Sequence, residues 1–206
     1  MLSSPRRSLS TIKSARLLAV IGLLAFSGLT VLSAVPTAFA AKSIGCGSAI
    51  KTSIVLTSDI GPCSGNGLNI KASGITIDCA GHTIQGPGSN TGYKGIVFVP
   101  PALSHDLSGV TVKNCAVTGF EYGYYITRAT TNDSLVNDVA NGNTYGFYLH
   151  GVTDIVLKFD TANSNSQYGY YNHQSRLGSG NTFIDDECSG NLVGGSSPTG
   201  LCTPQP

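Results

Sequence analysis

The sequence has little charge and no long run of good helix-forming residues. Only 11% of its 206 residues are charged, whereas 26 are glycine. Helical repeats need uninterrupted stretches of helix formers, so this composition argues against a helical architecture. Positive charge is scarce as well. All 11 acidic residues but only 8 of the 12 basic ones follow Ala40, which gives that part a net charge of 8 − 11 = −3. This charge excludes a nucleic-acid-binding protein.

The first 40 residues have the pattern of an export signal. Residues 1–16 carry four basic residues and no acidic one, residues 17–34 are almost wholly apolar, and Ala38-Phe39-Ala40 offers a small-x-small cleavage site. This pattern predicts a secretory signal peptide over residues 1–40 and a secreted or periplasmic protein that has no membrane association after cleavage. The alternative is a membrane anchor that stays in place, although the apolar run is near the lower length limit for a span.

Cysteines in the C-x-x-C spacing of metal sites are absent. All six cysteines follow the signal segment, and an even number in an exported protein indicates disulfides. Proximity in the sequence favours the pairs Cys46–Cys63 and Cys188–Cys202, which leaves Cys79–Cys115. For this middle pair, the alternative is two free thiols buried as small apolar side chains.

One short pattern recurs at a fixed interval and organises the chain. Tyr-Gly-aromatic-Tyr occurs at residues 122–125, 145–148 and 168–171, 23 residues apart each time, and a fainter copy lies at 95–99. Such a period indicates a solenoid, and alternating apolar residues separated by Gly, Asn, Thr and Ser indicate strands and turns. A coil of this length accommodates three short strands, each paired in parallel with its counterpart in the next coil. The predicted fold is therefore all-β, a parallel β-helix of about six coils.

A motif near the start of the repeats resembles a known family. Residues 78–86 read Asp-Cys-Ala-Gly-His-Thr-Ile-Gln-Gly. This stretch resembles the Asp-x-x-Gly-His-x-Ile-x-Gly pattern that opens many right-handed parallel β-helix repeat proteins of the pectate-lyase-like superfamily. The resemblance covers about residues 54–191 and implies a right-handed, single-stranded β-helix there. We expect residues 41–53 to form an N-terminal cap and residues 192–206 a C-terminal cap or tail, in which residues 194–202 are irregular and cover the open end of the helix. We interpret His82 as structural, because fold resemblance says little about sites.

The same resemblance implies two enzymatic activities. Pectate-lyase-like enzymes hold Ca²⁺ with clustered aspartates and abstract a proton with Arg or Lys, while the related hydrolases use grouped carboxylates as acid and base. The candidates in this sequence are few: Asp185, Asp186 and Arg176. Of the hydrolase motifs only the Asp-Asp pair is present, and neighbouring strand residues face opposite ways unless they lie on a turn. A small polysaccharide lyase or glycoside hydrolase is therefore an alternative function, with Ca²⁺ as the cofactor of a lyase.

Alternation along the repeated strands assigns side chains to the two faces. The inward columns are Ile96, Tyr124, Phe147 and Tyr170, and Phe98, Ile126, Leu149 and Asn172. The outward columns contain Tyr125, Tyr148 and Tyr171, with His150 and His173 beside them. Exposed aromatic rings suit stacking against the apolar faces of sugars. The main hypothesis is therefore an exported protein that binds extracellular or cell-wall polysaccharide through these five outward residues without a cofactor.

Two other interpretations of the outward face remain. The tyrosines could act only as cross-strand neighbours that stabilise the sheet, which would make the protein a purely structural component of the envelope. A zinc or copper site at His150 and His173 would need a third ligand that the sequence does not identify, so no metal is predicted. Nothing in the sequence indicates the oligomeric state.

Two details concern the register of the coils. Asn114 and Asn137 lie one period apart, which predicts that their amides stack along the solenoid. In the following coil, strict spacing would bury Lys158, whereas a slip of one residue would bury Ile155, Leu157 and Phe159 instead. Burying an unpaired lysine is costly, so the slip is predicted.

Overall fold

The computed structural model describes residues 44–100, 106–127, 130–173 and 180–204. All of them belong to one compact unit, Lys42–Pro206. The predicted signal peptide and Arg176 lie outside the described residues. Within the described ranges the chain forms strands and turns, and none of it forms a helix that is long and apolar enough to cross a membrane.

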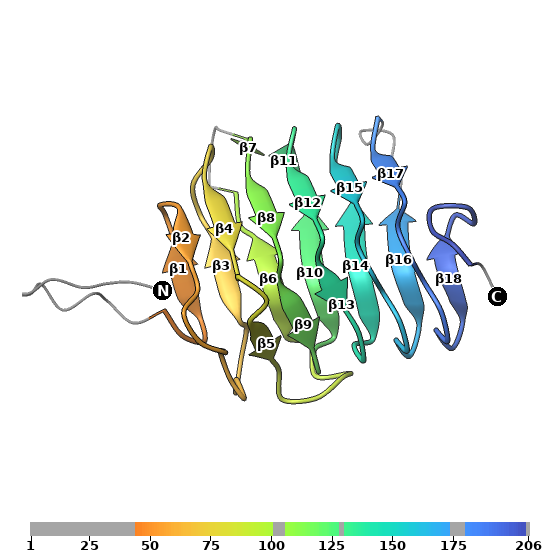
Figure 1. Ribbon diagram of the computed structural model, residues 1–206, viewed down its shortest axis with the longest axis horizontal. Helices are drawn as coiled ribbons and strands as arrows, with labels where there is room; N and C mark the ends of the chain where they lie inside the picture. The colour runs from red at the N-terminus through yellow and green to blue at the C-terminus, as the bar shows by residue number, and fades with distance from the viewer. Residues whose placement is uncertain (1–43, 101–105, 128–129, 174–179, 205–206) are drawn as a thin grey trace, which may run out of the picture. The chain divides into compact units, whose positions relative to one another are not determined.

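The strands stack in parallel along the solenoid (Figure 1). The largest sheet contains β1 (Ser48–Ile50), β3 (Leu68–Ile70), β6 (Lys94–Phe98), β10 (Tyr122–Thr127), β14 (Tyr145–His150), β16 (Tyr168–His173) and β18 (Gly194–Ser197), in that order. The second contains β2 (Ile54–Val55), β4 (Thr76–Asp78), β8 (Thr111–Lys113), β12 (Ser134–Val136), β15 (Val156–Lys158) and β17 (Thr182–Ile184). The third contains β5 (Thr83–Gln85), β9 (Ala116–Thr118) and β13 (Val139–Ala140), and β7 (Leu107–Ser108) pairs with β11 (Thr130–Thr131) at a corner.

This arrangement confirms the predicted right-handed parallel β-helix of about six turns. Consecutive strands of one coil, such as β10, β12 and β13, lie in three different sheets, and each pairs with the strand about 23 residues away. Residues assigned to the caps take part in the pairing, since β1 and β18 form the two ends of the largest sheet. The prediction that residues 194–202 are irregular is wrong for Gly194–Ser197. Backbone pairing with β16 makes these residues a strand despite their lack of β-branched side chains.

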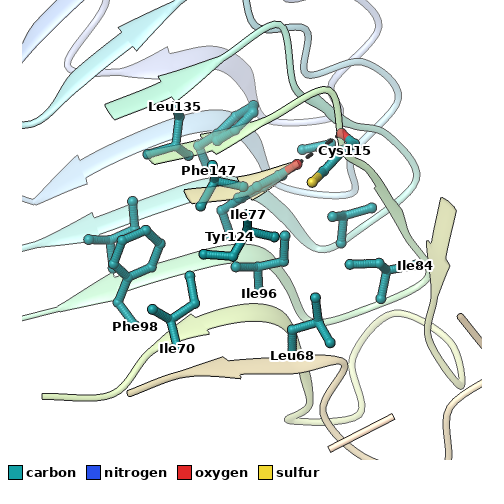
Figure 2. Packing of buried hydrophobic residues seen from close by; sticks show 14 of the residues in the cluster. Leu68, Ile70, Ile77, Ile84, Ile96, Phe98, Cys115, Tyr124, Leu135 and Phe147 are labelled. Carbon is teal, nitrogen blue, oxygen red and sulfur yellow. Dashed lines mark hydrogen bonds between the residues drawn. The ribbon is translucent and has the colours of Figure 1, made fainter. Parts of the chain in front are cut away.

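The inward columns form the core as predicted. Ile96, Tyr124, Phe147 and Tyr170 are fully buried, and they stack from coil to coil. The Tyr124 and Phe147 ring centroids are 4.6 Å apart, and those of Phe147 and Tyr170 are 4.9 Å apart. The buried hydroxyl of Tyr124 donates a hydrogen bond to the Cys115 carbonyl at 2.9 Å (Figure 2). This bond matters because a buried hydroxyl without a partner would destabilise the core.

The predicted register slip is confirmed for two of its three residues. Leu157 pairs with Leu135, 22 residues away, and both Ile155 and Leu157 are fully buried. The prediction is wrong for Phe159, which is 49% exposed because it lies at a corner with φ of 58° rather than in the strand. Lys158 stays at the surface, where its Nζ lies 4.7 Å from the centroid of the Phe159 ring.

Most corners of the coils that the structure describes are turned by a residue with left-handed backbone geometry. These residues form three columns with φ from 53° to 78°: Gly74, Gly109, Asn132, Asp154 and Gly180; Asn114, Asn137, Phe159 and Asp185; and Gly119, Gly142, Ser164 and Gly190. Gly and Asn adopt this geometry most readily, which explains their abundance in the sequence. The predicted stacking of Asn114 and Asn137 is confirmed, because the Asn137 Nδ2 donates to the Asn114 Oδ1 at 2.9 Å.

The residues after these left-handed corners point inward, and several carry a carboxyl or amide that accepts a backbone amide. At the first corner, Asp133 is buried and accepts the Val110 amide at 2.8 Å. At the other two corners these residues form columns. In the aspartate column, Asp138, Asp160 and Asp186, each Oδ1 accepts a hydrogen bond from the backbone amide one coil earlier, at 2.7 to 2.8 Å. In the asparagine column, Asn143, Asn165 and Asn191, the same bonds measure 2.9 to 3.0 Å. The two columns therefore satisfy buried amides that the turns leave without a strand partner.

The three predicted disulfides are all present. Cys46–Cys63 and Cys188–Cys202 lie near the two ends of the described chain, with Cα–Cα distances of 5.5 and 5.7 Å. Cys79–Cys115, with a Cα–Cα distance of 4.7 Å, rules out the alternative of free thiols in the middle. The Cys115 backbone amide donates a hydrogen bond to the Asp138 Oδ1, so this disulfide is attached to the first residue of the aspartate column.

Candidate functional site

The outer side of the largest sheet carries two rows of tyrosine. We call the tyrosine face the set Tyr122, Tyr125, Tyr145, Tyr148, Tyr168 and Tyr171. Within one coil, the ring centroids of Tyr122 and Tyr125 are only 4.9 Å apart, so both rings lie on the same side of the strand. A Cβ on the intervening Gly123 would lie 2.7 Å from the Gly146 carbonyl oxygen. Glycine therefore lets the chain turn inward between the two tyrosines.

The rings stack on one another along the solenoid. Tyr122 and Tyr145 are 10° from parallel with centroids 5.4 Å apart. Tyr148 lies between Tyr125 and Tyr171, with centroid distances of 5.5 and 5.2 Å and interplanar angles of 10° and 8°. Neighbouring rings therefore cover much of each other's faces. The inner rings present edges and hydroxyl groups to solvent, in place of the free ring faces expected from the sequence.

The chemistry of the tyrosine face is that of neutral phenols. Burial, followed by the charge of Glu121, raises the pKa of Tyr122 to about 12. Burial also raises the pKa of Tyr145 and of Tyr148. These hydroxyls therefore stay protonated at neutral pH, where each can donate and accept a hydrogen bond. At the β6 end, the Lys94 Nζ lies 5.6 and 4.9 Å from the Tyr122 and Tyr125 ring centroids and places a positive charge against the rows.

The two predicted histidines lie next to each other at the ends of β14 and β16. His150 pairs with His173, their ring centroids are 4.8 Å apart, and the rings are nearly perpendicular at 81°. The ring centroids of His150 and Tyr148 are 6.2 Å apart, so the histidines continue the tyrosine face. Within the four described ranges, no group of three or more His, Cys, Asp or Glu side chains comes together to hold a metal ion.

The predicted catalytic carboxylates occupy different environments. Asp185 is exposed at a left-handed corner, whereas Asp186 is 2% exposed and its Oδ1 accepts the Asp160 amide at 2.8 Å. Both border a small depression of about 160 Å³. Because Arg176 lies outside the described residues, the structure leaves this candidate site untested. The buried carboxyl of Asp186 belongs to the aspartate column.

Sequence reasoning missed half of the tyrosine face, namely Tyr122, Tyr145 and Tyr168. Strict alternation would have placed these residues inside with Tyr124. The signal that could have found them is the glycine that follows each one, because glycine at a recurring position marks a close backbone approach that interrupts the alternation.

The comparisons with known proteins agree with the fold. No curated protein and no solved structure matches the chain. A family model described as "Periplasmic copper-binding protein (NosD)" matches residues 39–200, which is most of the chain. The periplasmic location in that description agrees with the three disulfides, because such bonds persist outside the cytosol. The predicted location outside the cytosol is thereby confirmed. From the extent of this match and the solenoid it covers, the chain belongs to the NosD family of β-helix proteins.

Proposed function

We propose that this exported β-helix protein binds a polysaccharide along its tyrosine face. The observation that supports the proposal is the stacking of tyrosine rings at the interval of the coils. Tyr125, Tyr148 and Tyr171 stack from β10 to β16, and Tyr122 stacks on Tyr145 beside them. A polymer lying along the solenoid would meet equivalent groups at successive sugars. Tyrosine suits this role because its ring packs against apolar C–H groups while its hydroxyl bonds to sugar hydroxyls.

The geometry favours contact through hydrogen bonds rather than through stacking on every ring. The stacked rings leave little room for a sugar between them, since their centroids are only 5.2 to 5.5 Å apart. Their hydroxyls remain protonated, as the raised pKa values of Tyr122, Tyr145 and Tyr148 indicate. His150 and His173 add ring nitrogens at one margin of the face.

Replacing Tyr148 by phenylalanine tests this contact without disturbing the stack. Tyr148→Phe keeps the ring between Tyr125 and Tyr171 but removes its hydroxyl. Loss of one hydrogen bond to a bound glycan should weaken binding about three- to tenfold. Affinity is measured by calorimetry with a soluble neutral glucan and with polygalacturonate.

The matched control is Phe159→Ala, which removes an exposed aromatic ring at a corner beside the second sheet. It should bind as tightly as the unchanged protein. Equal affinities of Tyr148→Phe and the unchanged protein for a glycan that is bound would show that the tyrosine edges make no contact.

The same incubations, with and without Ca²⁺, report on the enzymatic alternative. Release of unsaturated or reducing ends that disappears in Asp185→Ala would replace the binding function by catalysis.

The family description also mentions copper, so the donor groups must be considered. Copper sites in proteins are built from thiolate, thioether and imidazole ligands. All six cysteines are in disulfides, and among the described residues the adjacent His150 and His173 gain no third His, Cys, Asp or Glu. The described residues therefore do not fit a copper centre held by this chain, and the proposed function involves no copper.

A further inference from the structure

A depression of about 630 Å³ lies at the C-terminal end of the tyrosine face. Tyr168 forms part of its wall, and the rest comes from β18 and the residues on either side of it. Tyr168 therefore belongs to both the tyrosine face and the depression. A ligand that follows the rows toward the C-terminal end would reach this depression next.

The tyrosine rows end here because β18 supplies small residues. Gly194 pairs with Tyr168, and Ser197 pairs with Tyr171, so β18 adds no ring beyond the last two tyrosines. The Tyr171 ring stacks against His173, with centroids 6.2 Å apart. Tyr168 tilts by 45° against Tyr171 at a centroid distance of 5.7 Å, and a Cβ on Gly194 would lie 3.2 Å from its Cε1. Gly194 therefore approaches one edge of the Tyr168 ring, and that ring also borders the depression. The end of the rows thus offers the aromatic surface that stacking hides in the inner coils.

The other walls combine apolar and uncharged polar groups. Leu192 is 80% exposed and Val193 is 52% exposed, although both are large apolar side chains. Ser197 and Thr199 provide hydroxyls, and none of the described residues that line the depression is charged. An aromatic ring flanked by apolar groups and neutral hydrogen-bonding groups is suited to an uncharged sugar ring, which has apolar C–H faces and a rim of hydroxyls.

We propose that this depression is a subsite for a neutral sugar residue, which packs on Tyr168 and Leu192 while its polymer continues along the tyrosine face. The inference rests on the proposed function, because continuity with the tyrosine face identifies the occupant. It adds a specificity that the rows alone do not provide. A charged sugar such as a uronate would lose hydration here without gaining a counter-charge.

The test compares a neutral gluco-oligosaccharide with an oligogalacturonate of equal length, using the exported protein and calorimetry. Tyr168→Ala should weaken binding of the neutral oligosaccharide about tenfold. Leu192→Ala, which shortens an exposed side chain and leaves the core intact, should weaken it about threefold. Tyr93→Ala is the control, since Tyr93 is also exposed but precedes β6, far along the sheet from β18.

The outcomes separate this inference from the proposed function. If Tyr148→Phe weakens binding but Tyr168→Ala and Leu192→Ala do not, the subsite is refuted and the tyrosine face stands. If only the Tyr168 and Leu192 variants weaken binding, a sugar occupies the depression without continuing along the rows, which refutes both the proposed function and the continuity on which this inference rests. Tighter binding of the uronate than of the neutral sugar would refute the proposed specificity, and absence of binding to either probe would refute both proposals.

Discussion

Asp160→Asn is expected to stabilise the folded protein at pH 8.5 and to lower its stability slightly at pH 4. Asp160 is fully buried, and burial raises its pKa from the ordinary 3.8 to about 8. A raised pKa means that the folded state holds the proton more tightly than the unfolded state does. The resulting stabilisation is complete below about pH 3.8 and is lost as the pH rises to about 8.

The size of the effect follows from that interval. At about 1.4 kcal/mol per pH unit, a pKa difference of about four corresponds to roughly 6 kcal/mol, an upper limit because the column can relax. The two neighbours of Asp160 in the aspartate column also have raised pKa values, so their ionisation at high pH lowers the stability of the fold as well. Burial raises the pKa of Asp138 well above its usual range and that of Asp186 to about 6. The Oδ2 atoms of Asp138 and Asp186 have no hydrogen-bond partner within the described part of the chain, which makes ionised carboxylates costly there.

Asparagine at this position would lose the bond in which the Asp160 Oδ2 accepts the Lys158 backbone amide at 3.2 Å, a loss of about 1 kcal/mol at every pH. The chain otherwise supplies the reason why asparagine should be tolerated there. Asn143, Asn165 and Asn191 accept the same kind of backbone amide bond at another corner, and their Nδ2 atoms donate to backbone carbonyls at 2.8 to 3.0 Å. The free energy of unfolding is measured in urea from pH 4 to pH 9 with the disulfides intact. Asp106→Asn, at an exposed carboxyl, is the control. A pH profile of the unchanged protein that is flat from pH 4 to 8, with no gain for Asp160→Asn at pH 8.5, would contradict the prediction.

Gly146→Ala is expected to lower the free energy of unfolding by about 3 kcal/mol, the upper end of the range for overpacked cores. A Cβ at Gly146 would lie 2.5 Å from the backbone oxygen of Gly169 and 3.0 Å from the Ala162 Cβ. The nearer contact is with backbone that is held by strand pairing, so it cannot be relieved by a change of rotamer. The coils on both sides would have to separate, which weakens the pairing of β14 with β16.

Gly45→Ala provides the control for this substitution. A Cβ at Gly45 meets no atom within 4 Å, and its backbone does not require glycine, so the same change of side chain should have little effect. Urea denaturation of both variants gives the comparison. Equal stability of Gly146→Ala and the unchanged protein would mean that the coils are not packed as closely as the structure describes.

The fold could be predicted because its main determinants are periodic in the sequence. The 23-residue repeat and the alternation around Phe147 indicated coils and an inward face, and both are present. The errors occur where the backbone departs from a strand. Phe159 was placed inside because nothing in its apolar side chain shows a left-handed corner. Gly194–Ser197 was missed as a strand because its pairing depends on the backbone of β16 rather than on its own side chains.

The candidate site was predictable only in part, for a similar reason. Alternation identified Tyr148 and His150 but not Tyr145, because Gly146 changes the direction of the chain between the two tyrosines. The aspartate column was also overlooked. Asp138 and Asp160 lie 22 residues apart, but a buried carboxyl is recognisable only when the backbone amide that donates a hydrogen bond to it from the previous coil is known.

The asparagine and aspartate columns join each coil only to the coils before and after it. The molecule is therefore comparable to a one-dimensional lattice, whose free energy is a sum over sites and over bonds between nearest neighbours. A weakened bond near either end lets a few terminal sites melt while the rest stays ordered. A weakened bond in the middle creates two boundaries between ordered and melted segments, and each remaining segment is short. The Cys79–Cys115 link joins the coils of β4 and β8, and Cys188–Cys202 joins the last two turns, so thermal melting cannot separate either pair. Loss of order is therefore expected to begin in the coils between them, which no disulfide joins to one another.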